Sequence, residues 1–282
     1  DPGADLGLTT RFGPDAAATE FDSCAPCHSR REELTPIADH AGALLDDYRP
    51  ATLAEGLYHP DGQILDEVYV YGSFVQSKMH AAGVRCSNCH DPHSLELRTD
   101  GNALCTQCHR NTAVEAFPTL TPAVYDTPSH HHHAADSPGS QCVNCHMPER
   151  TYMVVDPRRD HSFRVPRPDL SEALGTPNAC TACHNEGDAW AAAAVAAWSP
   201  DPPAPHFGPT LAAGRAGAPD AGPALAALVD DGDQPAIVRA TALELLRNYG
   251  QRGLDAARTA LASDDPTIRA TAAGGLASLA PP

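Results

Sequence analysis

All ten cysteines of the chain fall into five pairs of one spacing. Each pair has the form C-x-x-C and is followed directly by a histidine: Cys24, Cys27 and His28; Cys86, Cys89 and His90; Cys105, Cys108 and His109; Cys142, Cys145 and His146; and Cys180, Cys183 and His184. Two thiols at this spacing can bond to the two vinyl groups of one haem, and the imidazole that follows can then reach the iron. The spacing therefore predicts five covalently attached c-type haems, each with a proximal histidine ligand.

Disulfides and zinc sites are the other common uses of paired cysteines. Neither explains the histidine after every pair, and five pairs do not divide evenly into four-cysteine zinc sites. Covalent haem attachment is normally completed outside the cytoplasm, so we expect a periplasmic or extracellular protein. The chain begins at Asp1 without a methionine or a signal peptide, as expected of an exported product after processing.

Distal iron ligands are the next requirement of such sites. Fifteen histidines less the five proximal ones leave ten for the open sides of five irons. A haem that only transfers electrons has both axial positions filled, whereas a catalytic haem keeps one open. The supply of histidine therefore favours bis-histidine haems. The distal candidates are His59, His93, His130, His131, His133 and His161, with His80 behind them.

Sequence context supports three of these candidates directly. His93, in CHDPHS, lies too close to His90 to bind the same iron, so it would cap a neighbouring haem. His161 follows Asp160, and a carboxylate or carbonyl partner is what orients a ligating histidine. His59 precedes a Pro-Asp-Gly turn that can present its side chain inward.

The four consecutive histidines at 130–133 could supply the distal ligands that are still missing. With His59, His93 and His161 assigned, two irons still lack a distal ligand, and two members of the run can cap two different haems if their side chains diverge. A solvated polar run is the other interpretation. Less favoured as axial ligands are His40, His206, Met79, Met147 and Met153.

Charge and composition narrow the classes of partner. The chain carries 36 acidic and 19 basic residues, a net charge of −17, which argues against nucleic-acid binding because a phosphate backbone requires a basic face. Haem propionates would add negative charge and favour basic redox partners or bound cations such as calcium. The longest apolar run, at 189–198, is too short to span a membrane and predicts a short buried helix.

The composition also divides the chain into segments. We expect an extended arm at 1–20, a haem unit at 21–188, a short helix and proline-rich linker at 189–220, and a second unit at 221–282. Aromatic residues are only 5% of the chain, so haems would form the core of the first unit, wrapped by irregular and α-helical chain with little strand. In the second unit, Val238–Ala242 and Ile268–Ala272 match at a period of 30 residues. This period predicts a small all-α domain of HEAT-like repeats, docked on the haem unit or on another subunit.

The haem motifs resemble those of multihaem c-type cytochromes. The resemblance rests on the doubled pair CSNCHDPHSLELRTDGNALCTQCH followed by CVNCHMP, DHSF and PNACTACH, and it covers roughly residues 21–188. It implies bis-histidine haems stacked in a chain. Some members of that group end in helical repeats, and others of similar haem content polymerise as extracellular cytochrome filaments. A homopolymeric wire is therefore one expectation.

The sequence thus predicts an electron-transfer protein rather than an enzyme. Electrons would enter at one end haem, pass through five low-spin irons, and leave to a redox partner protein, an extracellular acceptor or the next subunit. The alternative is a multihaem reductase of the nitrite or hydroxylamine type with one open haem site. It is less favoured because no motif replaces its histidine by lysine and histidine is in excess. A scaffold whose repeats recruit a partner is a third interpretation.

Overall fold

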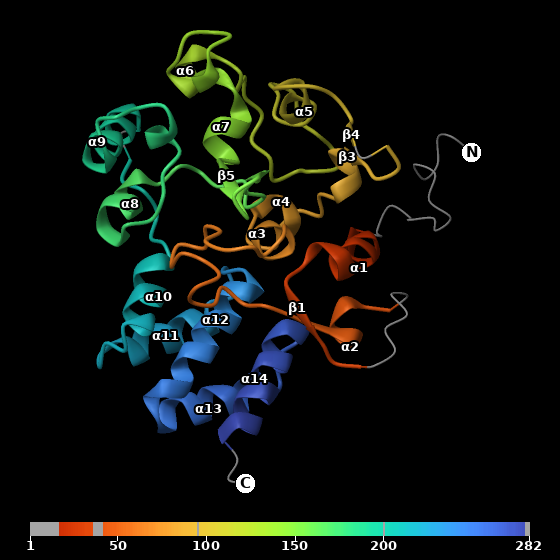
Figure 1. The fold of residues 1–282 in the computed structure, drawn as a ribbon, viewed down its shortest axis with the longest axis vertical. Helices are drawn as coiled ribbons and strands as arrows, with labels where there is room; N and C mark the ends of the chain where they lie inside the picture. Colours follow the sequence, from red (N-terminus) through yellow and green to blue (C-terminus); the bar gives the residue numbers. More distant parts are fainter. Residues whose placement is uncertain (1–16, 36–41, 95, 200, 280–282) are drawn as a thin grey trace.

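Short helices, small ribbons and long irregular segments form the first two thirds of the chain, and packed helices form the rest (Figure 1). The structure is a computed structural model that describes residues 17–35, 42–94, 96–199 and 201–279. Its α-helices are α1 (Ala17–His28), α2 (Leu44–Asp47), α3 (Tyr71–Phe74), α4 (Lys78–Ala81), α5 (Ala103–Thr106), α6 (Pro128–His131), α7 (Cys142–His146), α8 (Pro168–Leu174), α9 (Asp188–Trp198), α10 (Gly208–Arg215), α11 (Ala221–Asp230), α12 (Ala236–Leu246), α13 (Gln251–Ala260) and α14 (Pro266–Leu279). Its 3-10 helices are η1 (Cys86–Asn88), η2 (Pro138–Ser140), η3 (Cys180–Ala182) and η4 (Arg247–Tyr249).

Each sheet in the described part of the chain is a two-stranded antiparallel ribbon. The ribbons pair β1 (Arg31–Glu33) with β2 (Tyr48–Pro50), β3 (His90–Asp91) with β4 (Glu96–Leu97), and β5 (Glu149–Tyr152) with β6 (Asp156–Arg159). Isolated ribbons of this size are not stable alone, so other packing must hold this part together. The prediction of a mostly helical, irregular fold with little strand is confirmed.

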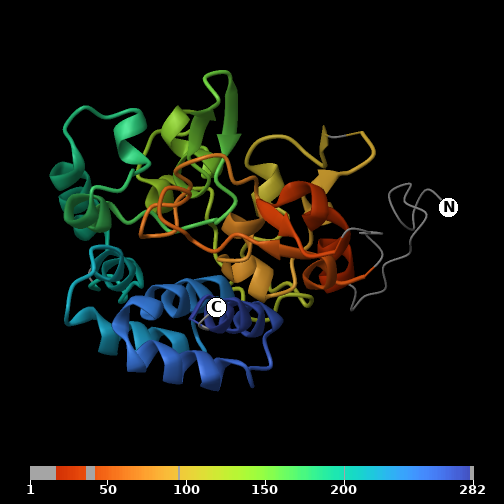
Figure 2. The same ribbon diagram turned by 60° about the horizontal axis from the view of Figure 1, so that its bottom comes forward.

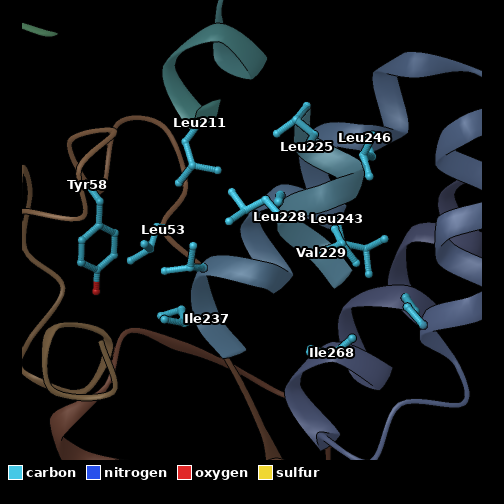
Figure 3. Close-up of a cluster of buried hydrophobic side chains, with 14 of the residues drawn as sticks. Leu53, Tyr58, Leu211, Leu225, Leu228, Val229, Ile237, Leu243, Leu246 and Ile268 are labelled. Atoms are coloured by element: carbon cyan, nitrogen blue, oxygen red, sulfur yellow. The ribbon is translucent and has the colours of Figure 1, made fainter. Parts of the chain in front are cut away.

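Helices α10 to α14 form one unit around the largest apolar cluster of the described residues (Figure 3). Leu211 of α10, Leu225 of α11 and Leu246 of α12 are fully buried. Full burial of such a side chain contributes about 1.5–3 kcal/mol each. The two stretches that match at a period of 30 residues lie in α12 and α14, where Val238 and Ile268 are equally buried. The expected helices are present, and their assignment to HEAT-like repeats stays a prediction.

The helical unit is docked on the segment that follows β2. Leu53 and Tyr58 of that segment belong to the same apolar cluster as the helices (Figure 3). The Leu53 backbone N–H donates to Thr241 Oγ1 of α12 at 2.9 Å, and the Arg215 guanidinium of α10 donates to the carbonyls of Leu53 and Tyr58. Of the two docking partners expected from the sequence, these contacts show the first, the haem-motif part of the same chain.

The part with the CxxCH motifs has few buried apolar side chains of its own. Apart from side chains that join the helical unit's cluster, the described residues of this part form one small cluster of Ala25, Leu44 and Tyr48. Figures 1 and 2 show α1 at one side of this part and α9 at the opposite side, with α10 to α14 beneath. The motifs are therefore spread across the molecule rather than gathered at one point.

Three segment predictions need correction. Residues 1–16 lie outside the described residues, but residues 17–20 are not an extended arm, because α1 begins at Ala17 and Glu20 is only 3% exposed. The run at 189–198 is a helix as predicted, yet only Ala191 is buried, and Trp190 and Trp198 are 39% and 43% exposed. Within the predicted linker, α10 packs on α11 and α12, so only the stretch between α9 and α10 joins the two parts.

Candidate haem sites

Every CxxCH motif lies on a helical turn. The turns are the last residues of α1, η1, the end of α5, α7 and η3. Within three motifs the second cysteine N–H bonds the first cysteine carbonyl: Cys89 to Cys86, Cys108 to Cys105, and Cys183 to Cys180. Residues three apart share a face of such a turn, so both thiols point to one side with the histidine just beyond. This is the local shape that two thioether bonds to one macrocycle require.

Three of the proximal histidines face a histidine from elsewhere in the chain. The ring centroids of His90 and His161 are 6.2 Å apart, and their planes differ by 24°. The rings of His146 and His130 are 6.1 Å apart with planes at 13°. Those of His184 and His133 are 6.0 Å apart with planes at 50°. Each pair joins a motif histidine to one of the distal candidates.

The separation within these pairs fits one metal ion between two rings. Two metal–nitrogen bonds of about 2 Å, with roughly 1.1 Å from each nitrogen to its ring centroid, place two opposed imidazoles about 6 Å apart. Packed aromatic rings also occur at this centroid separation, so the place of one ring of each pair in a CxxCH motif is what favours ligation. The residues present thus fit axial ligation of a haem iron at three of the five motifs.

Backbone carbonyls orient three of these rings. His146 Nδ1 bonds the Arg164 carbonyl at 2.9 Å, His161 Nδ1 bonds the Arg159 carbonyl at 2.9 Å, and His133 Nδ1 bonds the His131 carbonyl at 2.5 Å. A ring whose Nδ1–H is donated in this way keeps Nε2 unprotonated and free for a metal.

Burial supports the same protonation state. Desolvation is the main cause that lowers the pKa of His90, His130 and His161 below the ordinary value of histidine. Neighbouring histidines lower the pKa of each of them further. These imidazoles are therefore neutral at pH 7 and carry the lone pair that iron binds.

The other distal candidates are not placed opposite a motif histidine. His59 Nε2 accepts a hydrogen bond from Arg150 Nη1 at 3.1 Å. His80 lies against Phe21 and Phe74, with ring centroids 5.0 and 5.5 Å away. His93 is exposed in the turn between β3 and β4.

Two further histidines support the structure in other ways. His131 Nδ1 accepts the His133 N–H at 3.2 Å, so this residue helps to shape the run. His206 Nδ1 accepts the Gly208 N–H at 3.0 Å. His40 lies outside the described residues.

His28 and His109 have no such opposed histidine among the residues that the structure describes. His28 is exposed and lies close enough to His90 and His161 to lower their pKa values. His109 is half-buried, and the ring of Tyr125 meets it edge-on at 5.6 Å. The distal positions of the first and third motifs therefore stay predictions.

Cysteines of successive motifs lie next to each other. The thiols of Cys24 and Cys86 lie close enough to interact, which lowers the pKa of the first and raises that of the second. The same relation joins Cys105 and Cys142 in the third and fourth motifs.

The remaining neighbours are joined through the second cysteines of the second and fourth motifs. Burial, and then the nearby Cys108 thiol, raises the pKa of Cys89. Burial and the thiols of Cys180, Cys142 and Cys183 raise the pKa of Cys145. Spatial neighbours thus follow chain order from the first motif to the fifth.

Two polar side chains fasten neighbouring motifs together. Glu20, in α1, accepts hydrogen bonds from the Ser87 N–H at 2.8 Å and from Ser87 Oγ at 2.9 Å, and so ties the first motif to the second. Asn102, just before α5, accepts the Cys142 N–H at 2.9 Å and ties the third motif to the fourth. Nothing in the spacing of the CxxCH motifs indicates either residue, so sequence reasoning missed both.

Exposure distinguishes the two ends of this series. Cys27 of the first motif and Cys183 of the fifth are exposed, whereas the other eight cysteines are partly buried. The two motifs also lie at opposite sides of the molecule, on α1 and next to α9 (Figures 1 and 2). In the part of the chain that the structure describes, no three His, Cys, Asp or Glu side chains gather to hold a bare metal ion, and no helix is long and apolar enough to cross a membrane.

A comparison with family models agrees with this picture of the motifs. Residues 79–114, which hold the second and third motifs, match the doubled CXXCH motif. The chain is similar to multihaem c-type cytochromes. The match indicates covalent c-type haem, iron binding and electron transport, and such haem is attached outside the cytoplasm. No curated protein and no solved structure gives a match to this chain.

Proposed function

We propose that the chain is an electron-transfer protein that holds five c-type haems in one row, with two axial histidines on each iron. The observation that carries the proposal is the set of three histidine pairs at 6.0 to 6.2 Å, each joining a motif to a different segment. Bound haem supplies reversible one-electron oxidation and reduction of its iron. The protein's own part is to hold the irons in order and to close both axial positions.

The pairs assign three distal ligands. His161 would complete the second site, His130 the fourth and His133 the fifth. With both axial positions filled, no small molecule can bind the iron, so these sites favour electron transfer over catalysis. The segment that contains Arg159 and Arg164 orients ligands of both the second and the fourth sites, which fixes them relative to each other.

His93 is our proposal for the third site. The turn η1, which leads into the ribbon that carries His93, is held beside the end of α5, because the Gln107 side chain donates to the Asn88 carbonyl at 3.2 Å. The neighbouring thiols of Cys89 and Cys108 bring the second and third motifs together at the same place. For the first site, His80 is supported by its contact with Phe21 on the motif's own helix. His59 is a further choice for these two positions.

The series of cysteine contacts supports a single row in motif order. Electrons would pass from the first site to the fifth, or back, with the exposed ends near Cys27 and Cys183 as entry and exit. Basic redox partners and calcium ions are proposed from the net charge of −17, and an extracellular acceptor is proposed as one destination of the electrons. Assembly into an extracellular polymeric wire rests on the resemblance alone, and electron microscopy of the purified protein would test it.

Intact-mass measurement and spectroscopy of the haem-loaded protein test the proposal. We expect the mass of five haems, a wholly low-spin oxidised spectrum, and no change of the reduced spectrum with carbon monoxide. Fewer haems would contradict the proposal, and an iron that binds carbon monoxide and reduces nitrite would instead support the reductase.

Removal of single haems tests the row. Replacing Cys105 and Cys108 by alanine removes the third site, and we expect electrons injected at one end to stop reaching the other. Replacing Cys180 and Cys183 is the matched control, because it shortens the row but leaves four connected sites. Equal internal transfer rates in the two variants would contradict a single row.

A further inference from the structure

Helix α9 places two tryptophan rings on the histidines of the fifth site. The ring of Trp190 lies 4.7 Å from that of the proximal His184, at 37°. The ring of Trp198 stacks on His132 at 4.3 Å and 12°, and meets His133 edge-on at 6.5 Å. Each axial histidine of this site therefore has a tryptophan beside it.

Core packing does not explain these two positions. Trp190 and Trp198 are 39% and 43% exposed, and Ala191 is the only buried residue of the helix. A tryptophan usually gains most of its stabilisation by burying its large ring. Here the two rings instead contact the imidazoles of His132, His133 and His184.

The backbone of the histidine run needs support at this point. His132 has a φ of +57°, a left-handed conformation that L side chains rarely adopt. This turn ends α6 and directs His133 towards the fifth site, while His130 faces His146 of the fourth. The stack of Trp198 on His132 holds the turned residue in place.

The ring of His133 is also confined from the side of η2. A Cβ atom on Gly139 would lie 2.2 Å from His133 Cδ2, so only glycine fits there. The angle between the rings of His133 and His184 is 50°, against 13° and 24° in the other two pairs. The fifth site is therefore the one whose axial rings are most twisted among the three pairs.

We infer that Trp190 and Trp198 are positioning residues that set the orientation of the axial histidines at the fifth, terminal site. This inference rests on the proposed function, because it supposes iron between His133 and His184. The angle between two axial imidazole planes determines the anisotropy of a low-spin ferric haem. The fifth haem should therefore differ from the second and fourth in its electron paramagnetic resonance (EPR) signal.

EPR spectra of the oxidised, haem-loaded protein test this inference. The signal of the fifth haem is the one missing after Cys180 and Cys183 are replaced by alanine. In W198A we expect that signal to shift towards the signals of the near-parallel pairs, with five haems still bound. W198F, which keeps a ring, should restore it, and L261A serves as a control for loss of an exposed apolar side chain. An unchanged fifth signal in both W198A and W190A would overturn the inference.

A second variant covers the case in which W198A binds haem poorly. H132A removes the other half of the stack and leaves both tryptophans in place, so it should shift the same signal as W198A. The double variant should shift the signal no further than W198A alone, because H132A removes only the stack that W198A has already removed. If H132A leaves the signal unchanged, the inference is wrong. The proposed function fails separately, if the unaltered protein lacks a low-spin fifth haem.

Discussion

The histidine run allows the assignment of ligands to be tested one residue at a time. His130 and His133 face different proximal histidines, so each should serve one iron of the five. H130A should therefore turn one fifth of the iron high-spin, H133A another fifth, and the double variant two fifths. H131A and H132A are matched controls in the same run and should leave every iron low-spin.

The assay is quantitative EPR of the oxidised protein, with carbon monoxide binding to the reduced protein as a second measure. An alanine at 130 or 133 opens one axial position, which carbon monoxide then occupies. Variants should keep all five haems, since the thioether bonds do not depend on the distal ligand. Low-spin spectra in both H130A and H133A, or a high-spin fraction in H131A equal to theirs, would refute the reasoning.

Three further predictions concern stability. T241V removes the hydroxyl that accepts the Leu53 N–H and should lower the free energy of unfolding by about 1–3 kcal/mol in denaturant titration, because a buried donor is left unsatisfied. T271V changes the matching residue of α14 and loses only a bond to Thr267 of the same helix, so the free energy of unfolding should change little. Equal losses in T241V and T271V would contradict the docking. E20A should cost about 1.5–3 kcal/mol through the lost hydrogen bonds to Ser87, whereas E32A, whose carboxylate is exposed beside Arg49, should cost at most about 1 kcal/mol. Burial lowers the pKa of His206 to about 4, so the folded state takes up this proton later than the unfolded state as pH falls. Stability should therefore decrease from about pH 6.5 to pH 4, by up to about 1.4 kcal/mol per pH unit, and H206N should flatten this dependence; an unchanged slope would show that another group is responsible.

Local chemistry explains what could be predicted from the sequence. A CxxCH motif is a single helical turn, so its two thiols and its histidine are fixed relative to each other by five consecutive residues. The expectation that members of the 130–133 run diverge followed from counting ligands, and the structure turns His130 and His133 towards different motifs.

Long-range packing explains what could not be predicted. Which two members of the run face the motifs depends on the left-handed turn at His132 and on the room left by Gly139, and neither residue is part of a CxxCH motif. For His161 the sequence suggested Asp160 as the orienting group, but the Asp160 carboxylate accepts the Ser162 N–H and the ring bonds the Arg159 carbonyl instead. His59 has its Nε2 occupied by Arg150, a residue 91 positions away in the chain.

A structure of the haem-loaded protein, solved by crystallography or electron cryo-microscopy, tests the central claim most directly. The account predicts one iron between His90 and His161, one between His130 and His146, and one between His133 and His184, with the haems in motif order. Any of these pairs bound to two different irons, or a haem order that departs from motif order, would contradict it.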